Sequence, residues 1–291
     1  MTFDSPAPWL YAICFTVPAV VIVAALGLAR RYVRGTTLLA PWCWALLALA
    51  VLVGVEFLAL LVSEGTPRWL GAARYVAAVA TFCPTMAVLG AKRPQERAWH
   101  IIVLALWFVL ALPALQDVIY HYGRPISLDS AWRGFVALLI AVGWVNYLPT
   151  RYWPASILYG AAQVVLLADY LPLGDKLGID HTWRVPVALS LFALAAALPA
   201  LGWPSRTTVA DPAERLWRDF RDCYGILWAV RVDRRATETV NAAAPTDGSR
   251  SDPEALRANE RTLIAHLQRF VSRSWIIQRL PSAFVSFDPP K

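Results

Sequence analysis

Seven long apolar stretches occupy the N-terminal two-thirds of this chain. Each contains roughly 17 to 25 mostly apolar residues, which is long enough to cross a hydrocarbon layer of about 30 Å as an α-helix. A soluble domain would need polar residues to cover these helices, yet only 16% of the residues are charged and 58% are hydrophobic. The sequence therefore predicts an all-α integral membrane protein, with a bundle of seven transmembrane helices over residues 1–203.

The predicted spans are separated by short connections, so consecutive helices should be antiparallel neighbours. The fifth span is the shortest and is bounded by Pro149, and the side of the membrane on which the C-terminal tail lies depends on it. Inside the third span, Pro84 predicts a kink, because proline leaves a backbone carbonyl of the preceding turn without its helical partner. The predicted spans are residues 9–29, 39–62, 69–91, 99–119, 132–148, 153–171 and 185–203.

Positive charge follows the first and third spans, where it should be retained on the cytoplasmic side. The N-terminal segment instead carries Asp4 and no basic residue, so we expect it to be exported. The tail, residues 204–291, then lies in the cytoplasm, and we expect the protein in the cell inner (plasma) membrane, with the lipid bilayer as its first partner. The basic residues are Arg30, Arg31 and Arg34 after the first span, and Lys92, Arg93 and Arg97 after the third.

Two opposite charges lie at matching depth in neighbouring spans. At 1.5 Å per residue, Glu56 lies roughly 8 Å to the outer side of the second span's midpoint, and Arg74 roughly 9 Å to the outer side of the third span's midpoint. Either charge alone would cost several kcal/mol at that depth. We therefore expect Glu56 and Arg74 to form an ion pair.

Further polar residues are predicted in the same outer layer, and they allow two interpretations. They form mutually neutralising pairs that hold the helices in register, which the balanced charges favour, or they line a cavity for a solute or an ion. A buried amide near the middle of the sixth span also needs a hydrogen-bonding partner. These residues are Asp117, Arg133, Asp169 and Arg184 in the layer, and Gln163 near the middle.

The sequence contains no motif for nucleotide binding, zinc hydrolysis or a nucleophilic serine, and it predicts no cofactor. A haem held between two imidazoles would need histidines on facing helices at one depth, and no span interior supplies such a pair. His121 and His181 are predicted on the same outer side, which makes them weak candidates for a metal site.

The tail contains two predicted amphipathic helices. The first begins at Asp211 and Pro212, and the second begins at Pro253, after a polar linker at about residues 237–252. Their apolar stripes should pack on each other, lie on the inner leaflet, or dock on a membrane or cytoplasmic protein partner. Acidic residues interrupt both helices, which argues against nucleic acid as a partner. The residues that we expect to contact a partner are Trp217, Phe220, Trp228, Leu263, Leu267 and Phe270.

These features favour a non-enzymatic role, and we expect a membrane scaffold or a subunit for complex assembly. The alternative is a small-solute or ion transporter that uses the acidic residues of the outer layer. A second alternative is a membrane enzyme with a metal site near His121 and His181.

Overall fold

The computed structural model describes residues 8–62, 68–93, 96–120, 126–172, 178–205, 211–243 and 262–279. Within these ranges the chain is helical apart from turns, and it has no strand beyond one isolated antiparallel bridge between Thr36 and Val271. The all-helical fold predicted from the sequence is thus confirmed for the part of the chain that the structure describes.

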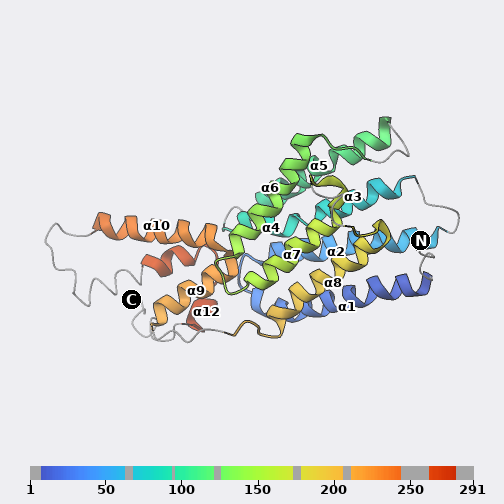
Figure 1. Cartoon of the computed structure of the whole chain (residues 1–291). Coiled ribbons are helices and arrows are strands. Elements are labelled where there is room, and N and C mark those ends of the chain that lie inside the picture. The colour runs from blue at the N-terminus through green and yellow to red at the C-terminus, as the bar shows by residue number, and fades with distance from the viewer. Residues whose placement is uncertain are drawn as a thin grey trace.

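Each predicted span coincides with one helix or with one interrupted helix (Figure 1). Five of them are long and apolar enough to cross a membrane: α1, α2, α3 together with α4, α5 and α8. α6 contains Arg133 and Asn146 and is not among these five, and α7 is shorter than they are. The helices are α1 (Pro8–Val33), α2 (Leu39–Leu61), α3 (Leu70–Ala80), α4 (Cys83–Leu89), α5 (Glu96–Tyr120), α6 (Ser130–Tyr147), α7 (Trp153–Leu166), the short 3₁₀-helix η1 (Ala168–Tyr170) and α8 (His181–Ala200).

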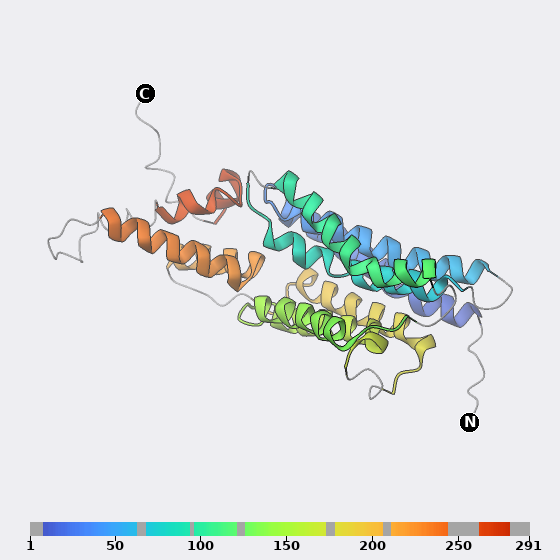
Figure 2. The same cartoon turned by 90° about the horizontal axis from the view of Figure 1, so that it is seen from above.

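The helices α1–α8 run along a common direction and form a bundle with two layers. Seen from above, α1–α5 form one layer and α6–α8 the other (Figure 2). α8 packs against both α7 and α1, and in this way joins the two layers. The start of α1 lies at one end of the bundle, and the helices that follow α8 lie at the opposite end, which we call the tail end (Figure 1).

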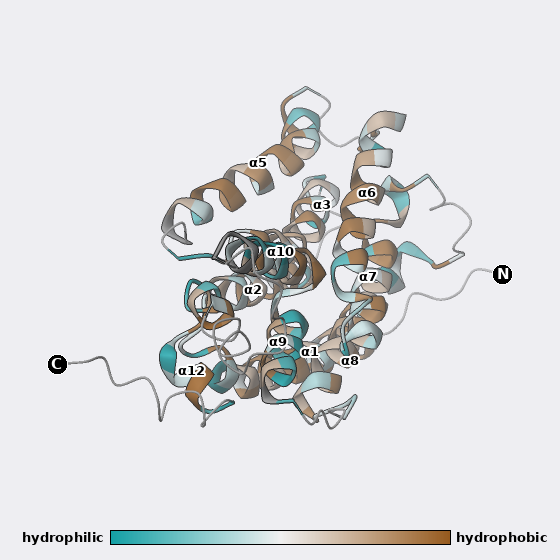
Figure 3. Ribbon diagram, turned by 90° about the vertical axis from the view of Figure 1, so that its left-hand side faces the viewer, coloured by the Kyte–Doolittle hydropathy of each residue, from teal (hydrophilic) through white to brown (hydrophobic). Residues whose placement is uncertain are grey.

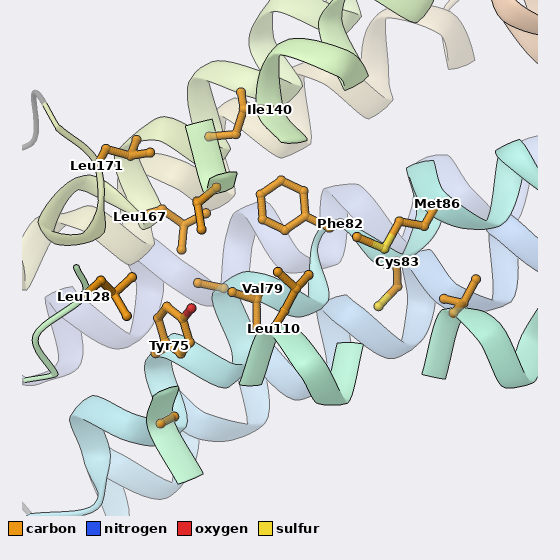
Figure 4. Packing of buried hydrophobic residues seen from close by; sticks show 14 of the residues in the cluster. Tyr75, Val79, Phe82, Cys83, Met86, Leu110, Leu128, Ile140, Leu167 and Leu171 are labelled. Atoms are coloured by element: carbon orange, nitrogen blue, oxygen red, sulfur yellow. The ribbon is translucent and has the colours of Figure 1, made fainter. Parts of the chain in front are cut away.

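Apolar side chains fill the interior of the bundle and also cover its surface. One buried cluster joins α3 and α4 to α5, α6 and the end of α7, and it includes Tyr75, Phe82 and Leu167 (Figure 4). On the surface, Val20 of α1 and Phe108 of α5 are more than half exposed. Seen from the tail end, apolar residues dominate the bundle helices (Figure 3). A surface of this kind is disfavoured in water and stable in lipid.

The kink predicted at Pro84 is confirmed as a break between α3 and α4. Around the break, the N–H groups of Thr81 and Phe82 bond to carbonyls three residues earlier, at 3.1 Å each. The Thr81 carbonyl accepts a hydrogen bond from the Tyr159 hydroxyl at 2.5 Å and another from Gln163 Nε2 at 3.3 Å. α7 therefore satisfies the backbone that the break exposes.

α6 and α7 approach each other closely where the indole of Trp144 lies over Gly160. A Cβ atom at residue 160 would lie 1.6 Å from Trp144 Nε1 and 2.3 Å from its Cε2. The indole ring would have to move to make room for any side chain, so only glycine fits here.

We expect Gly160→Ala to destabilise the bundle by about 3 kcal/mol, the upper end of the usual range for overpacking, because a rigid ring must be displaced. This cost exceeds the gain of about 1 kcal/mol from replacing glycine in a helix. Thermal unfolding of the purified protein in mild detergent measures the effect. The matched control is Gly134→Ala on α6, where the new Cβ meets no atom within 4 Å. A Gly160→Ala protein as stable as this control would show that the close approach is wrong.

The described residues of the tail form four helical segments, so the prediction of two helices is wrong. α9 (Pro212–Tyr224) ends at Gly225, whose φ of +80° suits glycine, and α10 (Ile226–Ala243) follows it directly. α10 extends through the first part of the predicted linker, while residues 244–261 lie outside the described residues. The second predicted helix is interrupted: residues 262–267 are helical, and α12 (Arg273–Ile277) follows after a turn.

The apolar stripes of the tail are covered within the chain. Of the three arrangements expected from the sequence, the described residues show the one in which the stripes pack on each other, and they also pack on the end of the bundle. Phe220, Trp228, Leu267 and Phe270 are at most 8% exposed and pack together with Val88 of the bundle. Trp217 and Leu263, also expected at a partner surface, are half-buried. The sequence pattern identified the apolar faces correctly, but periodicity alone does not reveal what covers them.

Backbone hydrogen bonds attach the tail to two loops at the tail end of the bundle. The loop after α1 contributes Thr37 N–H, which donates to Phe270 O at 3.0 Å, and Gly35 O, which accepts from Ser272 N–H at 2.7 Å. The loop after α4 contributes Arg93 N–H, which donates to Arg269 O at 2.8 Å. The tail is therefore a docked part of the same folded unit.

Candidate functional site

The structure brings Glu56 and Arg74 together as an ion pair. Arg74 Nε and Nη2 donate to the two carboxylate oxygens of Glu56, each at 2.7 Å, and Glu56 is fully buried. The hydroxyl of Tyr11 donates to the same carboxylate at 2.7 Å. Three helices are thus connected through one acid, whose charge is neutralised and whose oxygens are all hydrogen-bonded.

The rest of the predicted outer layer does not gather around this pair. Asp169 of η1 pairs with Arg184 at the start of α8, and Arg184 Nε also donates to Ile179 O at 3.2 Å. Asp117 and Arg133 form no ion pair with any other residue that the structure describes, and Arg133 Nε donates to Leu128 O at 3.1 Å. The layer therefore contains two separate neutral pairs and two residues outside any described ion pair, and none of these six residues lines the cavity described below.

The histidine candidates offer no metal centre within the described residues. His121 lies outside those residues. The exposed His181 has its Nδ1 3.2 Å from Asp180, the residue that caps the start of α8. There the Thr182 N–H donates to Asp180, which holds the pKa of that carboxyl below its usual range. Among the described ranges, no group of three His, Cys, Asp or Glu side chains is placed to hold a metal ion.

A cavity of about 410 Å³ lies between the two layers of the bundle. This volume lies within the range of about 300–1,000 Å³ that is typical of small-molecule sites. Six bundle helices form its walls, and α9 of the tail forms its floor with Asp222 and Cys223. Most of the lining is apolar, with Leu52, Leu189 and Phe192 as examples.

A group of polar side chains lies in the wall of the cavity on the side away from its floor, at the break between α3 and α4. It consists of Thr81, Thr85, Tyr159 and Gln163. Gln163 is only 3% exposed, and its Nε2 lies 3.3 Å from both Thr81 O and Thr81 Oγ1. The partner that the sequence predicted for this amide is therefore the interrupted backbone of the neighbouring span.

Charged residues close the floor of the cavity. Asp222 Oδ1 accepts from the Arg151 backbone N–H at 3.2 Å and lies 3.2 Å from Arg221 Nη2. Its Oδ2 lies 3.4 Å from Arg151 Nε, although not in hydrogen-bonding geometry. Beside it, burial raises the pKa of the Cys223 thiol to about 11, so this cysteine stays protonated and unreactive at neutral pH. The floor carries one acid between two arginines.

The cavity itself had no signal in the sequence, because its lining comes from residues 22 to 223 and no local pattern connects them. Of the candidate site residues singled out from the sequence, only Gln163 lines it, together with Pro84 at the predicted kink. Their common location with the residues of α9 depends on helix packing.

Comparison of the chain with known protein families, with curated proteins and with solved structures gives no match. The geometry of the cavity is therefore the basis for a functional assignment.

Proposed function

We propose that the chain crosses the membrane seven times, with its N-terminus outside and its tail in the cytoplasm of a cell with an inner (plasma) membrane. The support is that α6 and α7 lie alongside the five long apolar helices, so an odd number of crossings separates the N-terminus from the tail (Figure 1). Basic residues at the tail end favour the cytoplasm for that end, among them Arg30 in the last turn of α1 and Arg34 and Lys92 in the loops.

We further propose that the protein binds an apolar or amphipathic small molecule within this bundle. The observation that carries the proposal is the cavity, which is lined by six helices and the tail and is apolar except for a few polar groups. Such cavities are the usual form of small-molecule sites, because apolar walls provide affinity and a few polar groups fix orientation. A molecule that reaches this site partitions first into the lipid.

The functions expected from the sequence have less support in the geometry. The scaffold interpretation depended on uncovered stripes in the tail, and the tail buries most of their residues itself. The transporter interpretation depended on acidic residues in a shared cavity, and Glu56 and Asp169 are each neutralised by an arginine.

The proposal predicts that a bulky side chain in the cavity expels the ligand. Gly143 of α6 lines the cavity, and a Cβ at residue 143 would meet no atom within 4 Å. We expect Gly143→Trp to fold normally and to lose most of the bound molecule, because the indole takes up part of the same space. The measurement is mass spectrometry of apolar molecules extracted from the protein after purification from membranes in mild detergent.

Gly134→Trp is the matched control on the same helix. Gly134 is exposed, does not line the cavity, and also offers free space to a Cβ. The wild-type protein and Gly134→Trp should both carry a near-stoichiometric molecule that Gly143→Trp lacks. Equal amounts of extracted lipid from all three proteins would contradict the proposed function.

A further inference from the structure

The polar side chains in the cavity wall already use their hydrogen-bond donors within the protein. The hydroxyls of Thr81 and Thr85 donate to the carbonyls of Ala78 and Phe82, at 2.6 and 2.8 Å. Tyr159 donates its only hydroxyl proton to Thr81 O. Both hydrogen bonds of Gln163 Nε2 also go to Thr81.

The same group keeps acceptors that are not used. No described residue donates to the side-chain oxygen of Gln163, although this residue is only 3% exposed and lines the cavity. The orientation of the amide is fixed, because turning it over would place its oxygen against the Thr81 carbonyl oxygen, which is also an acceptor. Tyr159 Oη has remaining lone pairs as well.

One other donor in the wall is directed elsewhere. The indole N–H of Trp144 is buried against the backbone at Gly160, so it does not reach the cavity space. Ser156 and Tyr152 lie nearer the floor: Ser156 is seven residues before Gln163 on α7, about 10 Å along the helix. The part of the cavity beside Gln163 and Tyr159 therefore offers a ligand hydrogen-bond acceptors and no hydrogen-bond donor that is free.

The charges around the cavity disfavour an ionic ligand. Asp222 is the one acid among the described lining residues, and Arg151 and Arg221 both lie within 3.4 Å of it. Because Asp222 is already paired with these two arginines, which do not line the cavity themselves, it offers no free carboxylate to a cationic ligand. An anion beside Gln163 would meet only acceptors. A neutral molecule with a hydrogen-bond donor satisfies both conditions.

We propose that the cavity holds a neutral apolar alcohol whose hydroxyl donates to the side-chain oxygen of Gln163. This assignment rests on the proposed function and specifies the class of ligand. The apolar part of the molecule contacts the aliphatic and aromatic walls, while Tyr159 and Gln163 position its hydroxyl beside the break between α3 and α4. An ether or a hydrocarbon of the same shape would leave the acceptors unpaired.

The test compares myristyl alcohol with its methyl ether, which has the same chain and no donor. Binding of each radiolabelled probe to the delipidated full-length protein in nanodiscs is measured for the wild type, Gln163→Leu and Gly143→Trp. We expect the wild type to bind the alcohol about fivefold to tenfold more tightly than the ether, the factor that one buried hydrogen bond provides. Gln163→Leu should bind both probes with the affinity that the wild type has for the ether.

The outcomes separate this inference from the function on which it rests. If the wild type binds alcohol and ether equally while Gly143→Trp binds neither, the cavity is a site for apolar molecules and the alcohol assignment is wrong. If Gln163→Leu still prefers the alcohol, Gln163 is not the acceptor and the assignment is overturned. If the wild type binds neither probe above the level of Gly143→Trp, the proposed function fails as well. The comparison of the two probes on the wild type needs no variant to fold.

Discussion

Glu56→Ala is expected to lower the stability of the protein by about 3–5 kcal/mol, because it leaves Arg74 as an unpaired charge inside the bundle. Glu56 is fully buried and accepts two hydrogen bonds from Arg74 and one from Tyr11, so a single substitution removes three bonds between helices. For a domain of this size we expect the melting temperature in detergent to fall by roughly 10 °C. Thermal unfolding followed by size-exclusion chromatography measures the change.

The double variant Glu56→Leu with Arg74→Leu distinguishes the cost of the unpaired charge from the loss of packing. Removing both charges should recover most of the lost stability, because buried ion pairs are often replaced by apolar residues at little cost. If the double variant unfolds at the same temperature as Glu56→Ala, the unpaired arginine is not the cause.

Asp222→Ala is expected to loosen the docking of the tail by about 3 kcal/mol, the lower end of the range for breaking a buried ion pair. The side chain of Asp222 is 6% exposed, and its loss leaves Arg151 and Arg221 facing each other without an acid. The side chains of both arginines are about one-fifth exposed, and this contact with solvent lowers the cost of leaving them unpaired. Hydrogen–deuterium exchange should rise in α9 and α12 and stay unchanged in α1 and α2.

Glu214→Ala provides the control on the same helix. Glu214 pairs with Arg218 on the exposed side of α9, where such a pair contributes at most about 0.5 kcal/mol. Its exchange pattern should match that of the wild type. If Asp222→Ala also leaves the exchange of α9 unchanged, the ion pairs at the cavity floor do not hold the tail in place.

The positions of the bundle helices could be predicted because each depends on its own residues. A run of apolar residues forms a helix wherever the chain can bury or solvate it in lipid, so α2 (Leu39–Leu61) was predicted to within one residue at its end. The partner of Glu56 was also accessible to a simple depth argument, since adjacent spans fix which residues lie at one level. For Gln163 the sequence showed only that a partner was needed, and Thr81 lies in a span that is not adjacent in the chain. The separation of Asp117 from Arg133 depends on how the helices rotate, which depth does not determine.

The tail shows the opposite case. The spacing of Phe220 and Trp228 identifies an apolar face, but the face packs on residues 264–276 and on the end of α4, far away in the sequence. The break at Gly225 is marked by the glycine, and the side chain of Asn146 caps α10 by accepting from Leu227 N–H at 3.1 Å. That capping residue comes from α6, so no local reading of the tail could reveal it.

The bridge between Thr36 and Val271 joins the first loop of the bundle to the far end of the tail. Because a chain is synthesised from its N-terminus, the loop after α1 exists long before residues 262–279 are made. The floor of the cavity therefore closes only after all the bundle helices have been produced. During that interval the cavity is open on the tail side, and the docking of α9 completes its wall there. The cavity is therefore among the last features of the chain to form during biosynthesis.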